Sequence, residues 1–356
     1  MKIVLVTPSL DHGGGQRFIT ELANYWVTLN HNVTIISLRS GKSFYPILES
    51  VKIQELGYDR IVGLNKFNKF INAIDTLIKL RNKIKQVQPK FVLSILSSTN
   101  ILTIAATRNL KTNVFVNDVM SPYRIRVSFE KKMRKIFYKR ANGVIALTNI
   151  AKEVIYKETK SKNITVIPNP VKEVRIFKDI KKEKIILNVG RLVFDKGQKY
   201  LLKAYAKLNR PDWKVVILGE GDRRKSLEKL IKELNITNQV LMPGAVKNVD
   251  EWLSKASIFA FPSVSESWGL ALTESMAAGL PSVSFDCDVG PREMIVDGDN
   301  GFLVPVADVD LFAKRIEQLI NDEKLRNKFS LNAKKEAEKY KIEKIGNRIL
   351  EFCTNS

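Results

Sequence analysis

The stretch from Phe261 to Gly279 reads FPSVSESWGLALTESMAAG and holds two acidic residues, Glu266 and Glu274, eight positions apart around a glycine-containing turn. A helix is expected to begin near the glycine of this turn, so its first backbone N–H groups lack intrahelical partners. These groups belong to Gly269, Leu270 and Ala271. With the helix dipole they form an anion site suited to a diphosphate, and the two carboxylates can accept hydrogen bonds from sugar hydroxyls. The stretch therefore predicts a site for a phosphorylated sugar.

Short apolar runs alternate with amphipathic helical patterns along the 356 residues, which predicts βαβ units and parallel sheets. The expected strands are Ile3–Val6, Val33–Ser37, Phe91–Leu96, Val114–Val116, Val144–Leu147, Ile185–Val189, Val215–Leu218, Ser257–Ala260 and Ser282–Phe285. Nine strands are many for one sheet, and Pro168-Asn-Pro170 followed by a charged segment indicates a linker. We therefore expect an α/β protein of two Rossmann-like, doubly wound domains, 1–170 and 171–337. Ligands are expected in a central cleft at the carboxyl ends of the strands.

Two further segments carry groups suited to phosphates. The run Gly13-Gly14-Gly15 follows the first expected strand and lets a ligand approach the backbone, although a glycine run alone is more often a flexible turn. The second segment starts at Gly190-Arg191 and reaches Lys196. Its guanidinium and ammonium groups, five residues apart at a strand end, can converge on a diphosphate.

The stretch around Glu266 and Glu274 resembles the E-x7-E signature of retaining glycosyltransferase family 4, whose members have the GT-B fold of two facing Rossmann-like domains. Members usually read Glu-Gly-Phe-Gly where this chain has Glu266-Ser-Trp-Gly269. The resemblance implies that Glu274 holds the ribose and Glu266 the donor sugar. It also implies that Arg191 and Lys196 stabilise the departing diphosphate.

The same resemblance extends to other segments. It implies that Gly14 and Gly15 approach the donor phosphate. It also implies that Gly190 opens the motif that holds the nucleotide diphosphate, and that the segment containing Val246 lies around the nucleotide base. It further implies an acceptor-binding domain at 1–170, a domain for the nucleotide sugar at 171–337, and a final helix, 338–356, that packs back on the first domain.

A metal and a general base are both open questions for this sequence. Asp286-Cys-Asp288 mimics the Asp-x-Asp metal motif of the other glycosyltransferase fold, but GT-B members carry a similar run without a metal, so no catalytic metal or other cofactor is expected. Many family members have a histidine after the strand that corresponds to Val114–Val116. This chain has Asp118 there, which we expect to take a polar role near the sugar.

The net charge is +22, and residues 1–170 carry +17 of it, which predicts an anionic partner for the first domain. The segment 124–140 is a basic helical pattern, in which Phe129, Met133, Ile136 and Phe137 are expected to pack inward. Its cations are expected to face an anionic membrane or the acceptor. They are Lys131, Lys132, Arg134, Lys135 and Lys139. Nucleic acid is the rival partner, but no nucleic-acid-reading motif supports it.

The uncharged stretch from Phe91 to Thr107 is nearly long enough to span a membrane, but it divides into a buried strand and the start of a helix. The amino-terminal sequence starts directly as a strand and lacks the pattern of a signal peptide, which predicts a cytoplasmic protein. Two cysteines and two histidines are too few for a disulfide framework or a His-rich metal site.

The middle of the first domain is similar to bacterial transferases that extend lipid-linked oligosaccharides, including those that add N-acetylgalactosamine in N-glycosylation. Together these features predict a retaining transferase on the inner face of the plasma membrane. It would move a hexose or N-acetylhexosamine from a UDP-sugar to a polyprenyl-diphosphate-linked glycan in surface polysaccharide or glycoprotein synthesis. The alternatives are a GT-B UDP-sugar epimerase, and a non-catalytic module that binds lipid or nucleic acid.

Overall fold

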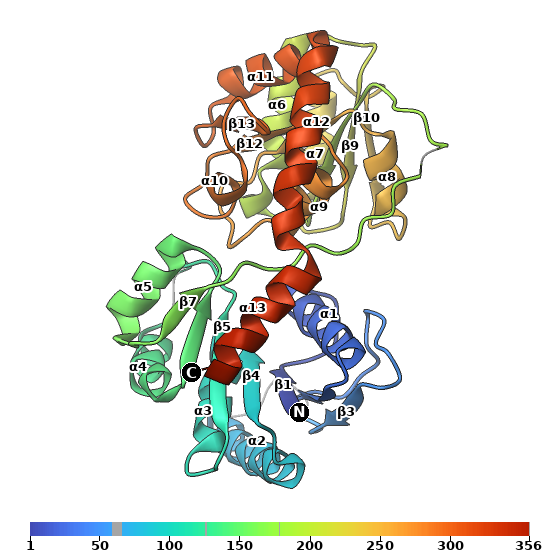
Figure 1. Ribbon diagram of the computed structural model, residues 1–356. Helices are drawn as coiled ribbons and strands as arrows, with labels where there is room; N and C mark the ends of the chain where they lie inside the picture. The colour runs from blue at the N-terminus through green and yellow to red at the C-terminus, as the bar shows by residue number, and fades with distance from the viewer. Residues whose placement is uncertain (59–65, 125–126, 178, 356) are drawn as a thin grey trace. The chain divides into compact units, whose positions relative to one another are not determined.

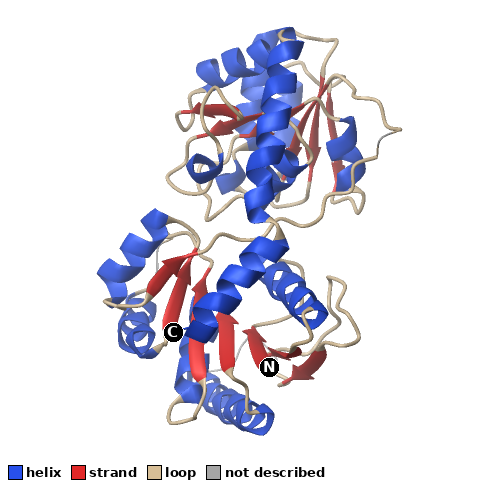
Figure 2. Cartoon of the chain, in the orientation of Figure 1, coloured by secondary structure: helices blue, strands red, loops and turns tan. Residues whose placement is uncertain are grey.

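The computed structural model describes residues 1–58, 66–124, 127–177 and 179–355, with the side chains of 66–70 left out. The chain forms two compact units (Figure 1). Unit 1 comprises Met1–Pro170 and Ile342–Ser356, and unit 2 comprises Val171–Lys341. In each unit, parallel strands lie between helices (Figure 2). The fold class is therefore α/β, as predicted.

Unit 1 contains a parallel sheet which, over the described residues, has seven strands in the order β3-β2-β1-β4-β5-β6-β7. The strands are β1 (Lys2–Thr7), β2 (Asn32–Ser37), β3 (Lys52–Glu55), β4 (Phe91–Ile95), β5 (Asn113–Asp118), β6 (Gly143–Ala146) and β7 (Ile164–Val166). The helices are α1 (Gly14–Thr28), α2 (Lys66–Val87), α3 (Ser97–Thr107), α4 (Ser128–Phe137), α5 (Asn149–Thr159) and α13 (Ile342–Asn355). The strand order changes direction between β1 and β4, which makes the carboxyl ends of these strands a topological switch point.

Alternate residues of β1 enter two different cores, because successive side chains of a strand point to opposite faces. Ile3 and Leu5 pack with α1 and α13, whereas Val4 and Val6 pack with α2 and α3. Both faces of the sheet are thus covered, which explains why its central strands are apolar throughout.

Helix α13 follows unit 2 in the sequence but belongs to unit 1. Its residues Ile345, Ile349 and Cys353 are buried in the core that contains α1. The backbone approaches closely here: Trp26 Nε1 donates a hydrogen bond to the carbonyl of Gly346 at 3.2 Å. A Cβ at Gly346 would lie 2.5 Å from the ring of Tyr25.

Unit 2 contains a second parallel sheet, which over the described residues has six strands in the order β10-β9-β8-β11-β12-β13. The strands are β8 (Ile185–Val189), β9 (Lys214–Leu218), β10 (Val240–Gly244), β11 (Ile258–Phe261), β12 (Ser282–Phe285) and β13 (Gly301–Val304). The helices are α6 (Gln198–Leu208), α7 (Arg224–Glu233), α8 (Val249–Lys255), α9 (Leu270–Ala277), α10 (Pro291–Met294), α11 (Val309–Asn321) and α12 (Glu323–Ala337). Helices α6, α7 and α11 share one core with the sheet. The switch point of this sheet lies between β8 and β11.

The stretch from Phe91 to Thr107 forms β4 and α3, as expected from its division into a strand and a helix. In the described parts of the chain, no helix has the length and apolar character needed to cross a membrane.

Candidate active site

The switch point of unit 2 brings Lys196 and Glu266 into contact. Lys196 ends a short 3-10 turn, Phe194–Lys196, in the loop after β8, and Glu266 lies in the loop after β11. Lys196 Nζ is 2.5 Å from Glu266 Oε1, and the ammonium lies 5.8 Å from the centre of the Phe261 ring. The side chain of Glu266 is 7% exposed and that of Lys196 23% exposed. Two residues that are 70 positions apart therefore form a partly desolvated ion pair.

Gly197 explains why the two loops fit together. Its φ of 62° is left-handed, and a Cβ there would lie 1.9 Å from the carbonyl oxygen of Pro262. The backbone N–H of Val264 also donates a hydrogen bond to the carbonyl of Asp195 at 2.8 Å. Backbone packing of one loop on the other thus fixes the position of Lys196, and only glycine satisfies it.

The expected helix start is confirmed. Helix α9 begins at Leu270, and Gly269 before it has a φ of 107°. The first hydrogen bonds of the helix come from the N–H groups of Leu272 and Thr273, and both go to the carbonyl of Gly269. The N–H groups of Gly269, Leu270 and Ala271 precede this ladder at a helix end with partial positive charge. Glu274 lies one turn further along α9 and is buried.

The ends of β8, β9 and β10 also meet at this edge of unit 2. Gly219 donates a backbone hydrogen bond to Gly244 at 2.8 Å, and a Cβ at Gly219 would lie 2.0 Å from the oxygen of Gly190. Arg191 follows directly and is exposed, and Val246 is half-buried just after β10. The unit 2 residues singled out from the sequence therefore all lie in loops, or in a helix, that follow the carboxyl ends of the strands.

In unit 1, Gly14 and Gly15 form the first turn of α1. A Cβ at Gly15 would lie 3.1 Å from Ile95 at the end of β4 and 3.9 Å from Val119 after β5. The glycine turn therefore packs against the carboxyl ends of β4 and β5, of which β4 borders the switch point of this sheet.

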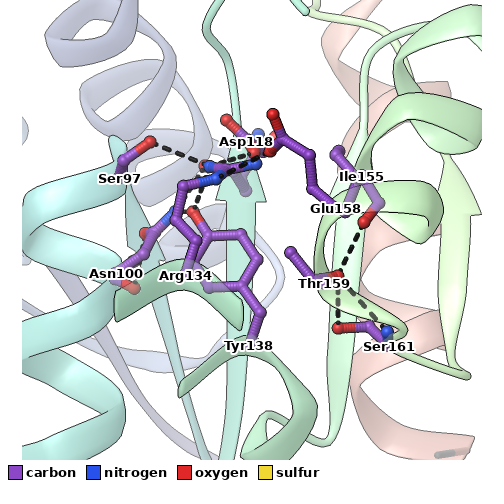
Figure 3. A network of polar contacts seen from close by, with 11 residues as sticks. Ser97, Asn100, Asp118, Arg134, Tyr138, Ile155, Glu158, Thr159 and Ser161 are labelled. Carbon is purple, nitrogen blue, oxygen red and sulfur yellow. Dashed lines mark hydrogen bonds and ion pairs between the residues drawn. The ribbon is translucent and has the colours of Figure 1, made fainter. Parts of the chain in front are cut away.

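Asp118, at the end of β5, forms a buried ion pair with Arg134 of α4 (Figure 3). Arg134 Nη1 lies 2.6 Å from Asp118 Oδ2, and the two side chains are 0% and 1% exposed. Arg134 Nε also contacts Glu158 of α5 at 3.2 Å. The expectation that Arg134 faces a membrane or the acceptor is therefore wrong. Asp118 has no solvent-exposed oxygen in this arrangement, so its expected polar contact with the sugar is not supported.

Further polar groups complete this network. Arg134 Nη1 donates hydrogen bonds to the hydroxyls of Ser97 and Tyr138 at 2.9 and 3.0 Å. Asn100 Nδ2 donates to the same Tyr138 oxygen at 3.1 Å. Burial lowers the pKa of Arg134, but the negative charges of Asp118 and, to a smaller extent, Glu158 outweigh it and the net shift is upward. Burial, aided by Asp118, raises the pKa of Tyr138, so its hydroxyl stays protonated.

With Arg134 buried, α4 is turned about its own axis compared with the orientation that its apolar pattern predicted. Phe129 and Ile136, expected to pack inward, are 72% and 38% exposed. Met133 and Phe137 are half-buried. The lysines of α4 and the turn after it are exposed, as a surface that faces a membrane or an acceptor requires; they are Lys131, Lys132, Lys135 and Lys139. The exposed surface of α4 is therefore both basic and apolar.

The Asp-x-Asp sequence does not gather metal ligands. Asp286 instead accepts a hydrogen bond from Arg292 Nε at 3.0 Å. Over the described residues, no group of three or more His, Cys, Asp or Glu side chains lies close enough to hold a metal ion. Cys287, between the two aspartates, is buried, and this burial, with the nearby charge of Glu266, raises its pKa to about 12.

The sequence matches two families whose domains cover nearly the whole chain. Residues 12–175 match "Glycosyltransferase Family 4", and residues 171–336 match "Glycosyl transferases group 1". The chain is a family 4 glycosyltransferase. As a retaining enzyme of this family, it transfers a sugar from a nucleotide sugar.

Two named relatives and one solved structure cover nearly all of this glycosyltransferase. It is 29% identical over 351 residues to the GalNAc-α-(1→4)-GalNAc-α-(1→3)-diNAcBac-PP-undecaprenol α-1,4-N-acetyl-D-galactosaminyltransferase of Campylobacter jejuni, covering 97% of this chain and 96% of that protein. It is 26% identical to the amylovoran biosynthesis glycosyltransferase AmsD of Erwinia amylovora, covering 92% of each chain. The crystal structure of Anabaena HepE in complex with UDP superposes with a TM-score of 0.86 at 18% identity and covers 100% of both chains. The fold is GT-B.

Proposed function

We propose that this family 4 glycosyltransferase moves a hexose or N-acetylhexosamine from a UDP-sugar to a polyprenyl-diphosphate-linked glycan. The observation that carries the proposal is the contact of Lys196 with Glu266 in unit 2 beside the free N-terminus of α9. A lone carboxylate pair is common on protein surfaces. Here, however, a cation, two carboxylates and a row of N–H groups lie at one edge of the sheet.

The cationic groups of this edge serve the diphosphate. Arg191 supplies a planar fork for phosphate oxygens and Lys196 a point charge. Negative charge grows on the diphosphate as the sugar–phosphate bond breaks, so groups fixed in advance stabilise the transition state more than the ground state. Glu266 holds the Lys196 ammonium in place, and the backbone packing at Gly197 limits its movement.

The two carboxylates have different tasks in the proposal. Glu266, next to Lys196, accepts hydrogen bonds from hydroxyls of the donor sugar. Glu274 lies one turn into α9 and accepts hydrogen bonds from the ribose of UDP. The recognised part of the donor is thus held at both ends, and the bond that breaks lies between them.

Transfer with retention proceeds in this proposal by attack on the same face from which the UDP departs. The leaving phosphate oxygen accepts the proton of the acceptor hydroxyl, so no side chain has to act as the base. This fits the burial of Asp118, whose oxygens are taken out of solvent by Arg134. The proposed reaction needs no metal, because cations and N–H groups supply the positive charge.

The acceptor is proposed to be lipid-linked and the enzyme to work on the inner face of the plasma membrane. The name of the Campylobacter relative contains a PP-undecaprenol acceptor, which supports this assignment. The surface of α4 also suits a peripheral position, because exposed Phe129 and Ile136 lie among four exposed lysines. Aromatic and basic side chains on one helix face favour an anionic bilayer surface.

The test is an incubation of the purified full chain with a panel of UDP-sugars and polyprenyl-diphosphate-linked glycans. Release of UDP together with a lengthened glycan of retained anomeric configuration is expected for one donor. Release of UDP without lengthening of any lipid-linked acceptor would contradict the proposed acceptor. Conversion of the UDP-sugar to its epimer, with no transfer, would favour the epimerase alternative.

A further inference from the structure

Unit 1 contains a cavity of about 600 Å³ on the side of the sheet where β5 begins, away from the carboxyl ends that meet Gly15. It is bounded by the C-terminal end of α3, the loop from α3 to β5, and the end of α4 with the turn after it. Its apolar part is formed by Ile104, Leu110, Val114 and Phe137. Nothing in the sugar-transfer reaction uses this cavity.

Three cations line the cavity, and no carboxylate does. They are Arg108, Lys111 and Arg140. Each is exposed, and none forms an ion pair within the described part of the chain. Arg140 also lies over the ring of Phe137 at 5.7 Å, which keeps its guanidinium near the apolar wall. Three positive charges without a compensating acid favour an anion, and guanidinium groups suit phosphate oxygens in particular.

The position of the cavity indicates where such an anion comes from. Phe137 and Arg140 belong to the end of α4 and its following turn, so the cavity continues the surface that carries exposed Phe129 and four exposed lysines. Arg140 thus connects a basic, partly apolar helix surface with a cationic cavity that has an apolar wall. A phosphate ester bonded to an apolar group matches both parts.

We infer that this cavity binds the phosphate ester headgroup of an anionic phospholipid. The phosphate contacts Arg108, Lys111 and Arg140, and the glycerol portion packs against Phe137. The site anchors unit 1 in one orientation, whereas a diffuse basic field attracts the protein without orienting it. The same phosphate chemistry occurs in soluble esters, so the experiment has an arm for each source.

The first arm measures partition of the full chain onto vesicles of phosphatidylcholine with an equal amount of phosphatidylglycerol. Replacing all three cavity cations by Gln is expected to reduce the partition coefficient by roughly 100-fold. Each cation near an anionic surface contributes a factor of about five, and the three factors multiply. The matched control replaces three exposed lysines of unit 1 outside the cavity, Lys52, Lys85 and Lys90. An equal loss in both triple variants would overturn the inference, because a general field would explain both.

A second variant leaves the charge unchanged. Ala105 is half-buried and lines the cavity, so Ala105→Phe fills part of the space, and Ala105→Ser is its control. We expect Ala105→Phe to bind vesicles at least tenfold more weakly than wild type and Ala105→Ser to bind them as wild type does. The thermal unfolding temperature of both variants should be unchanged. Replacing Arg108 and Arg140 by Lys keeps the charge but removes the forks, and the same direction is expected. If Ala105→Phe and the variant with Lys at positions 108 and 140 both partition as wild type does, the inference that the cavity is a shaped binding site is wrong.

The second arm uses glycerol 3-phosphate and inorganic phosphate as soluble probes in titration calorimetry. Glycerol 3-phosphate is expected to compete with vesicle binding by wild type and to leave the residual binding of the triple cavity variant unchanged. Binding of glycerol 3-phosphate that Ala105→Phe abolishes, together with undiminished vesicle partition of that variant, would overturn the lipid source in favour of a soluble phosphate ester. UDP release on a short soluble acceptor should stay at wild-type level in every cavity variant, which separates this test from that of the transfer reaction.

Discussion

Replacing Arg134 by Met should destabilise unit 1 strongly, because it leaves a buried charge without a partner. The guanidinium contacts Asp118 at 2.6 Å, Glu158 at 3.2 Å and Ser97 at 2.9 Å. Glu158 is 25% exposed and can be hydrated after the change, but the Asp118 side chain is 1% exposed. Breaking one side of a buried ion pair costs about 3–5 kcal/mol, a large part of the roughly 5–15 kcal/mol that holds a domain folded.

The double variant separates this charge effect from loss of packing. Removing both charges in Asp118→Asn with Arg134→Met replaces the unpaired buried charge by a neutral buried amide, whose loss of hydrogen bonds costs about 1–3 kcal/mol. The two changes should therefore compensate each other by about 2 kcal/mol or more. Lys135→Met, at the adjacent exposed position, is the control and should stay within about 0.5 kcal/mol of wild type.

Hydrogen exchange followed by mass spectrometry suits a chain with two units, because each unit is read from its own peptides. In Arg134→Met, the slowest amides of β5 and α5 should exchange roughly 100- to 5000-fold faster, since each 1.4 kcal/mol is about a factor of ten. Peptides of α11 in unit 2 serve as the internal reference. Acceleration below tenfold in unit 1, or a double variant as unstable as the two single changes added together, would refute the assignment of an uncompensated charge.

Four further outcomes test the proposed site and surface. Lys196→Ala and Arg191→Ala should each keep the fold and lower turnover by about 100-fold, and near-normal turnover in both would remove the diphosphate assignment. Glu274→Ala should weaken UDP binding in calorimetry, whereas Glu266→Ala should lower turnover with UDP affinity kept; equal UDP affinity in wild type and Glu274→Ala would contradict this division. Turnover should survive EDTA, and loss of activity with rescue by Mn²⁺ would revive a metal role. Changing the four exposed lysines of α4 and the turn after it to Gln should reduce binding to anionic vesicles, as should added salt; unchanged vesicle binding would make this a solvated face.

The strands found from the sequence are those in the interior of the two sheets. All nine expected strands are present, whereas the four edge strands, β3, β7, β10 and β13, were missed. An interior parallel strand is buried on both faces and reads as a continuous apolar run. An edge strand does not have to be buried on both faces, so it need not be an apolar run. Strand β3 reads KIQE with mostly exposed side chains, and β10 contains Pro243. Apolar runs therefore predicted the fold class but not the width of each sheet.

The residues of the proposed donor site could be singled out from the sequence because the chemistry proposed for them is local. Glu266, Gly269 and Glu274 lie within one strand-turn-helix segment, so their spacing already determines which groups meet at the start of α9. Local spacing alone does not predict the contact of Lys196 with Glu266, because that contact also depends on β8 and β11 being neighbours in the sheet. Parallel topology supplies this, because loops after adjacent strands share one edge of the sheet.

Helix α4 shows where such local inference ends. Its apolar periodicity assigned Phe129 and Ile136 to the core and Arg134 to the surface, and the structure has the reverse. The reason is the position of Asp118, which β5 places under the helix where an apolar residue would bury an uncompensated charge. Leaving the buried Asp118 carboxylate without a partner costs about 3–5 kcal/mol, which exceeds or matches the gain of about 1.5–3 kcal/mol from burying one apolar side chain instead. The orientation of α4 is thus set by a carboxylate distant in sequence, and the rotation is what leaves apolar side chains among its exposed lysines.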